Sequence, residues 1–234
     1  MMMSKSFGVA STLLLSCCLA QAQISAVGKG YVFRVTFTPK QVATYQVTHR
    51  MVGQNIRVVP STVRVTCTEI KQGFFNVEVD EQVDEQADTV SQDPPIYQKS
   101  WVNDRGHSAH KLPFWFSTCP YGPVKMKSRW RGNPPLLAER EGAPASAPFV
   151  YTLTGFEIKD GRKAARLGFS YVNAPTYHHK TETSYAGGML IDSSNGQLLD
   201  FTLSRTDRLP AEATSKGSQS KPLVSTSVTR LVRV

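Results

Sequence analysis

Cysteine is scarce in this sequence. The 234 residues include four, and two of these, Cys17 and Cys18, lie in an apolar run near the N-terminus. Removal of that run would leave Cys67 and Cys119, with no Cys-x-x-Cys pair for a zinc site or a dithiol redox centre. In an oxidising compartment, two remaining thiols predict one disulfide between Cys67 and Cys119. The alternative is that each is buried separately as a small apolar side chain.

Motifs for metal binding and nucleophilic catalysis are also missing. The sequence contains no Gly-x-Ser-x-Gly elbow and no His-Glu-x-x-His pattern. His107 and His110 could share an ion only on a helical turn, and the adjacent His178 and His179 would point to opposite faces of a strand. We interpret these histidines as solvated loop residues and expect neither a metal nor a cofactor.

Carboxylates are most closely grouped in one region. They are Asp80, Glu81, Asp84, Glu85 and Asp88. The region is the end of an expected strand and the polar loop after it, where like charges normally stay solvated. Together with the missing motifs, this predicts a protein without enzymatic activity.

Long hydrophobic runs are absent after the N-terminus. Lys5, an apolar run from Phe7 to Leu19 and the small-x-small pattern Ala20-Gln21-Ala22 predict a signal peptide over residues 1–22. We therefore expect an exported protein of the periplasm or the extracellular space, beginning at Gln23. Lipid anchoring at Cys17 is the alternative, although Leu15 fits poorly in the small-residue position before such a cysteine.

Amphipathic helices are missing too, because no segment of useful length repeats apolar residues with a period of 3.6. Apolar and polar residues instead alternate between turns such as Asp160-Gly161 and Asn195-Gly196, which is typical of hairpins. The pattern predicts an all-β protein with an antiparallel curved sheet, half-barrel or sandwich of about nine or ten strands. The expected strands are 31–37, 42–51, 62–70, 74–83, 96–102, 149–158, 163–172, 185–191, 197–204 and 223–234.

Residues 132–148 are rich in proline, glycine and alanine and interrupt this pattern. We interpret them as a connection between an N-terminal β half, residues 23–131, and a C-terminal β half, residues 149–234. Both halves are expected to belong to one domain.

Lysine and arginine exceed aspartate and glutamate by 27 to 18, and they are spread widely along the chain. Binding to nucleic acid is not expected for an exported chain without a known module. Peripheral contact with an anionic envelope surface or an anionic ligand fits the charge, and solubility alone also explains it.

Aromatic residues concentrate in the irregular stretch from Leu112 to Trp130, next to several lysines and arginines. Stacking and charge could make this stretch a ligand-facing rim. The alternative is a loop that buries its rings as core. The candidate ligand-binding residues are Trp115, Phe116, Tyr121, Arg129 and Trp130.

Four segments carry a family resemblance: Tyr151–Gly155, Asp160–Ala164, Gly187–Asp192 and Asn195–Asp200, with the opening Gly28-Lys29-Gly30-Tyr31 before them. Their succession resembles exported bacterial β-rich domains of unknown function. More distantly, the sheet pattern is similar to periplasmic lipoprotein carriers of the LolA type, which form a half-barrel closed by helices. Neither resemblance implies a catalytic residue.

These observations predict a non-enzymatic binding or interaction module of the periplasm or cell envelope. Its partner would be a protein or a small hydrophobic or anionic ligand. One alternative is a carrier that holds such a ligand in the concave face of the sheet, and another is a structural component of the envelope. A cavity inside the sheet that the protein's own side chains do not fill would favour the carrier.

Overall fold

The computed structural model describes residues 24–52, 59–83, 96–105, 120, 122–174, 181–209 and 223–234. Several predictions lie outside the described residues. They are the signal peptide at 1–22, the candidate residues Trp115, Phe116 and Tyr121, the histidines 107, 110, 178 and 179, and Cys119.

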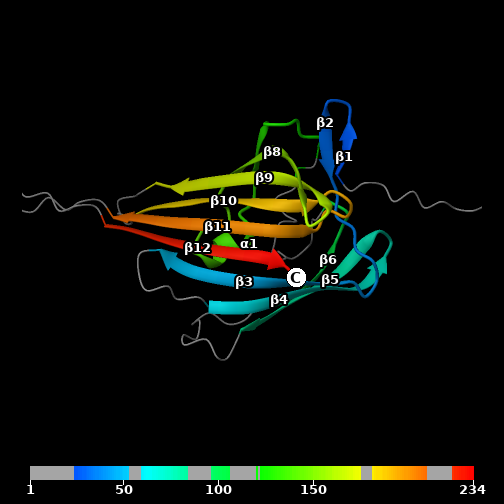
Figure 1. Ribbon diagram of the computed structural model, residues 1–234, viewed down its shortest axis with the longest axis horizontal. Helices are drawn as coiled ribbons and strands as arrows, with labels where there is room; N and C mark the ends of the chain where they lie inside the picture. The colour runs from blue at the N-terminus through cyan, green and yellow to red at the C-terminus, as the bar shows by residue number, and fades with distance from the viewer. Residues whose placement is uncertain are drawn as a thin grey trace, which may run out of the picture.

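Within the described residues, ten strands form one antiparallel sheet and two form a separate hairpin (Figure 1). In sheet order the ten are β6-β5-β4-β3-β12-β11-β10-β9-β8-β7. The elements are β1 (Ile24–Val27), β2 (Gly30–Phe33), β3 (Val42–Val52), β4 (Val59–Lys71), β5 (Phe74–Val83), β6 (Tyr97–Val102), β7 (Arg129–Gly132), α1 (Leu136–Arg140), β8 (Phe149–Lys159), β9 (Arg162–Asn173), β10 (Glu182–Asp192), β11 (Leu198–Leu209) and β12 (Leu223–Arg233). The predicted all-β, antiparallel curved sheet is confirmed.

The sheet consists of two runs of hairpins that meet at β12 and β3. β3 to β6 follow one another on one side, and β7 to β12 do so on the other. The join pairs Leu231 with Val47 and Arg233 with Tyr45. Because these partners are far apart in the sequence, no local signal predicts which strands meet there.

Three elements were not predicted: β1, β7 and α1. The predicted strand 31–37 also ends early, at Phe33. Beyond Phe33 the backbone bonds to loops instead of a strand, since Val35 N donates to Asp104 O and Thr36 N donates to Asn195 O. α1 has five residues and lies inside the predicted connection 132–148.

The core lies on one face of the sheet, which we call the inner face. Alternate residues of each strand point to it, among them Tyr45, Val65 and Val77 on one side and Leu167 and Leu203 on the other. From β8 to β11, the inner face carries a cluster of rings, each with its centroid within 6.5 Å of at least one other: Phe149, Tyr151, Phe169, Tyr171, Tyr185 and Phe201. α1 packs on this face, where Ala138 is fully buried.

Candidate functional site

A cavity of about 380 Å³ lies on the inner face beside α1. Three apolar side chains line it: Val47 of β3, Val83 of β5 and Leu137 of α1. The rest of its lining is polar or ionisable and comes from both sides of the sheet: His49, Ser61, Glu81, Arg140, Glu141, Arg205 and Thr229. One wall is therefore apolar, and the remainder carries hydrogen-bonding groups.

Glu81 and Arg140 form a buried ion pair at the β5 side of the cavity. Arg140 Nη1 lies 2.6 Å from Glu81 Oε2, and the Glu81 side chain is 5% exposed. Ser61 Oγ donates to the other carboxylate oxygen at 2.8 Å, and Ile96 N donates to Oε2 at 3.3 Å. The pair holds the end of α1 against the sheet.

The sequence-based interpretation of Glu81 as a solvated carboxylate is wrong. The alternation along β5 places Glu81 on the same face as Val77 and Val79, both of which are fully buried. A carboxylate is tolerated there because Arg140 supplies the compensating charge and Ser61 a further hydrogen bond.

A second polar cluster joins Glu141, at the end of α1, to β3 and β12. Thr229 Oγ1 donates to Glu141 Oε1 at 3.0 Å. His49 Nδ1 lies 2.8 Å from Thr229 Oγ1 and 3.1 Å from Glu141 Oε1. Because the hydroxyl proton of Thr229 points to Glu141, the proton of the His49–Thr229 bond must belong to Nδ1.

Arg205 and Tyr185 fix the backbone at Glu141. The hydroxyl of Tyr185 donates to the Glu141 carbonyl at 3.0 Å, and Arg205 Nη1 donates to the same oxygen. Arg205 is also paired with Asp207 at 3.0 Å. Four strands therefore position the carboxylate of Glu141 beside His49.

The pKa values of His49 and Glu141 shift in opposite directions. The hydrogen bond from His49 to Glu141 raises the pKa of the imidazole above 6.5, and this outweighs the effect of burial. Burial alone would raise the pKa of Glu141, but His49, Thr229 and Arg205 stabilise its charged form, so the net shift is downward from 4.5. Both shifts favour an ion pair.

The pH dependence of stability follows from these directions. The stabilisation of the fold by His49 is complete below about pH 6.5 and is lost as the pH rises through the raised pKa of the imidazole. The stabilisation by Glu141 is lost as the pH falls through the lowered pKa of its carboxyl group. Between roughly pH 6 and pH 9, urea unfolding should therefore show a loss of no more than about 1 kcal/mol, because solvent screens a half-buried pair. His49→Gln should remove this slope, and an unchanged slope in the variant would contradict the assignment.

His49 is the lining group that is best placed to meet a ligand. Its Nδ1 is engaged by Thr229 and Glu141, while among the described residues Nε2 has no protein partner. A protonated imidazole would present Nε2–H as a donor to the cavity. The carboxylates differ, because Glu81 and Glu141 already accept hydrogen bonds from the protein.

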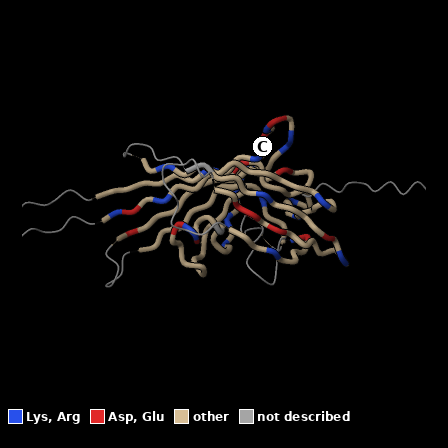
Figure 2. Tube along the Cα trace, turned by 90° about the horizontal axis from the view of Figure 1, so that it is seen from below, with Lys and Arg blue, Asp and Glu red and all other residues tan. Residues whose placement is uncertain are grey.

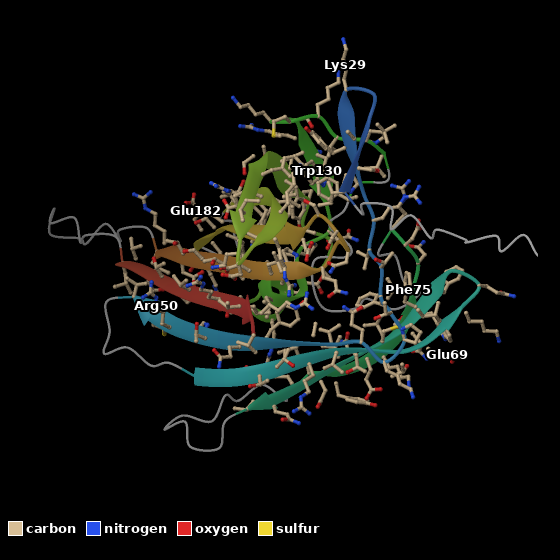
Figure 3. All side chains as sticks on the ribbon, turned by 45° about the vertical axis from the view of Figure 1, so that its right-hand side comes forward. Lys29, Arg50, Glu69, Phe75, Trp130 and Glu182 are labelled. Atoms are coloured by element: carbon tan, nitrogen blue, oxygen red, sulfur yellow. The ribbon has the colours of Figure 1, made fainter. Side chains whose placement is uncertain are left out.

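Of the five predicted ligand-binding residues, the structure describes Arg129 and Trp130. Both lie on β7, an edge strand of the sheet, and not at the inner-face cavity. Trp130 is half-buried near the base of the β1–β2 hairpin, with its ring 5.9 Å from Tyr151 and 6.4 Å from Phe33 (Figure 3). Arg129 is exposed. Trp130 thus packs against the core, and its role in ligand binding stays a prediction.

Sequence reasoning did not single out the residues that line the cavity. His49 was placed correctly on the face of Tyr45 and Val47, but nothing local marks it as part of a site. Arg140 and Glu141 lie in the predicted connection, where no periodic pattern indicates a direction. The one available signal was the position of Glu81 in the alternation of β5.

Cys67 is a fully buried free thiol on β4, and burial raises its pKa. The structure therefore shows no disulfide at Cys67, and the predicted partner Cys119 lies outside the described residues. In the described part of the chain, no group of three or more His, Cys, Asp or Glu side chains is placed to hold a metal ion. The same residues include no helix that is long and apolar enough to cross a membrane.

Comparison with known proteins gives no family and a distant structural similarity. No family model and no curated protein matches the chain. Among solved structures, a LolA superfamily protein from Nitrosomonas europaea is similar over 84% of this chain and 88% of its own, with 12% sequence identity and a TM-score of 0.21.

Proposed function

We propose that this chain is a non-enzymatic binding protein that holds one small amphiphilic molecule in the inner-face cavity. The observation that carries the proposal is the cavity itself, in which an apolar wall faces a set of fixed hydrogen-bonding groups. Its volume of about 380 Å³ is within the range of small-molecule sites, roughly 300 to 1,000 Å³.

The two sides of the cavity define the class of ligand. Val47, Val83 and Leu137 would receive an apolar portion by excluding water from it. The head group would face His49, whose raised pKa favours the donor form of Nε2. We therefore infer a ligand with a hydrogen-bond acceptor, such as a carboxylate or carbonyl, next to an aliphatic chain or ring.

The hydrogen-bond pattern supports binding over catalysis. A general acid or base must exchange a proton with the substrate, and an activated nucleophile needs an adjacent base. Here Ser61 donates to the buried Glu81, and Thr229 donates to the half-buried Glu141, so both hydroxyls are committed to carboxylates. These groups hold α1 on the sheet.

The location of this binding activity is part of the same proposal. The charge, apolar run and cleavage pattern of residues 1–22 support export to the periplasm or the extracellular space. Lysines and arginines are scattered over the described chain among acidic residues (Figure 2), which supports at most a peripheral contact with an anionic surface.

Native mass spectrometry of protein purified from its own host tests the binding function. The wild type should retain one molecule of an amphiphile. Val47→Trp, which places an indole in the cavity, should retain none, and so should Val83→Trp at the half-buried end of β5. Val42→Trp is the matched control, since Val42 is exposed on β3 and does not line the cavity.

Each variant is used only if its thermal midpoint shows that it is folded. Retention of the same molecule by both cavity variants would contradict the proposal. So would a wild-type protein that retains nothing and takes up nothing from a lipid extract of the same host.

A further inference from the structure

A second cavity, of about 660 Å³, lies at another part of the sheet, where several turns and strand ends converge. It is lined by the turn between β8 and β9, the turn between β10 and β11, and the end of β12, close to the C mark in Figure 1. Arg233 lies four residues beyond Thr229 on β12, so the two cavities occupy different stretches of the same strand. This cavity has no part in the function proposed above.

The lining of this cavity is predominantly cationic. Arg162, Lys163 and Arg233 contribute three positive charges, and Asp192 is the carboxylate among its lining residues. Asp192 is buried and already engaged: its Oδ1 accepts from Ser194 N at 2.8 Å and from Ser194 Oγ at 2.6 Å. Arg162 Nη1 lies 3.6 Å from Asp192 Oδ2. Lys163 and Arg233 thus have no carboxylate partner among the lining residues, and Lys163 Nζ lies 5.3 Å from the centroid of the Phe156 ring.

Two of the residues that line this cavity each carry a buried donor atom that lacks a partner among the described residues. Among the described residues, neither Arg233 Nη1 nor Ser193 Oγ has a hydrogen-bond partner, although both atoms are buried from solvent. Ser193 as a residue is only 8% exposed. A buried donor without an acceptor costs free energy, so such atoms are rare unless something else binds them.

The turn that carries Ser193 is rigid. Gly196 has a φ of +70°, and a Cβ there would lie 1.9 Å from the carbonyl oxygen of Arg34. Gln197 Nε2 donates to Thr36 O at 3.1 Å, and Thr36 N donates to Asn195 O at 2.9 Å. Because the turn is fixed on two sides, Ser193 cannot easily move to find another acceptor.

We propose that this cavity is a binding site for a phosphate group. A phosphate offers several acceptor oxygens and up to two negative charges, which match the guanidinium of Arg233, the ammonium of Lys163 and the hydroxyl of Ser193. The cavity has room for more than a single phosphate, so the group could be part of a larger molecule. That molecule is either a phospholipid or a free phosphate ester.

Titration with inorganic phosphate, at constant ionic strength kept with chloride, tests the site. Amide chemical shifts of the wild type should change in a saturable manner at residues 192–197 and 233. Arg233→Gln should raise the Kd at least tenfold, and Ser193→Ala should raise it severalfold. Arg230→Gln is the matched control, because Arg230 lies on β12, is half-exposed and is paired with Asp200 outside the cavity. It should leave the Kd unchanged.

Two further titrations distinguish the source of the phosphate. Glycerol phosphate that binds more tightly than inorganic phosphate, without sedimentation of the protein on vesicles, would identify a free ester. Sedimentation on phosphatidylglycerol vesicles that is lost in Arg233→Gln would identify a lipid. Absence of saturable binding to every probe, or equal effects of Arg233→Gln and Arg230→Gln, would overturn the proposal. Neither result would bear on the inner-face cavity.

Discussion

Arg140→Met is expected to lower the free energy of unfolding by about 3 kcal/mol. The substitution leaves Glu81 as a charge that is nearly buried and has lost its partner, and removal of one member of a buried pair typically costs about 3 to 5 kcal/mol. We expect the lower end of this energy range because the Arg140 side chain is 23% exposed. Urea unfolding at neutral pH measures the loss.

The double variant Glu81→Gln with Arg140→Met should recover most of this stability, because no buried charge remains. Arg166→Met is the matched control: its partner Glu157 is 30% exposed and Arg166 itself 58%. Its loss should stay below about 1 kcal/mol, as is usual for surface pairs. An equal loss in the double and single variants would show that packing of Arg140, and not its charge, holds α1.

Gly187→Ala is expected to be at least as disruptive, at about 3 kcal/mol or more. A Cβ at Gly187 would lie 2.0 Å from the carbonyl oxygen of Thr202 and 2.5 Å from the ring of Phe169. The carbonyl belongs to the neighbouring strand β11, so the clash requires backbone movement at the centre of the sheet. The thermal midpoint and the urea midpoint should both fall.

Gly155→Ala is the control that separates the general effect of replacing glycine by alanine in a strand from the effect of a steric clash. A Cβ at Gly155 meets nothing within 4 Å. The variant should be neutral or slightly more stable, within about 1 kcal/mol, because alanine restricts the unfolded chain. Similar losses at Gly155 and Gly187 would mean that the close approach to Thr202 and Phe169 does not limit stability.

The strands of this protein were predictable where one face is buried and the other is wet. Alternation along β3, β5 and β9 was long enough to locate each strand and to orient its side chains, and the flanking turns helped to locate β8, β10 and β11. β7 was missed because four residues, Arg129 to Gly132, are too few to show a period, and its pairing with β8 is set by the rest of the fold.

The candidate site was less predictable because its contacts join distant parts of the chain. Glu81 and Arg140 are separated by 59 positions and Glu141 and Thr229 by 88, so no local pattern relates them. The alternation of β5 did place Glu81 on the inner face. Its charge nevertheless indicated a solvent-exposed side chain, because its partner Arg140 could not be identified from the sequence. Gly187 was noted only as part of a turn-rich motif, and its packing against Phe169 explains why a side chain does not fit.

The most direct test of the central claim, that the inner face binds an amphiphile, is a methyl-detected NMR titration with dodecanoate. We predict saturable shifts of the methyl groups of Val47, Val83 and Leu137 with one equivalent bound, and their loss in Val47→Trp. Shifts confined to exposed methyl groups such as those of Val42 and Ile158, without saturation, would contradict the account.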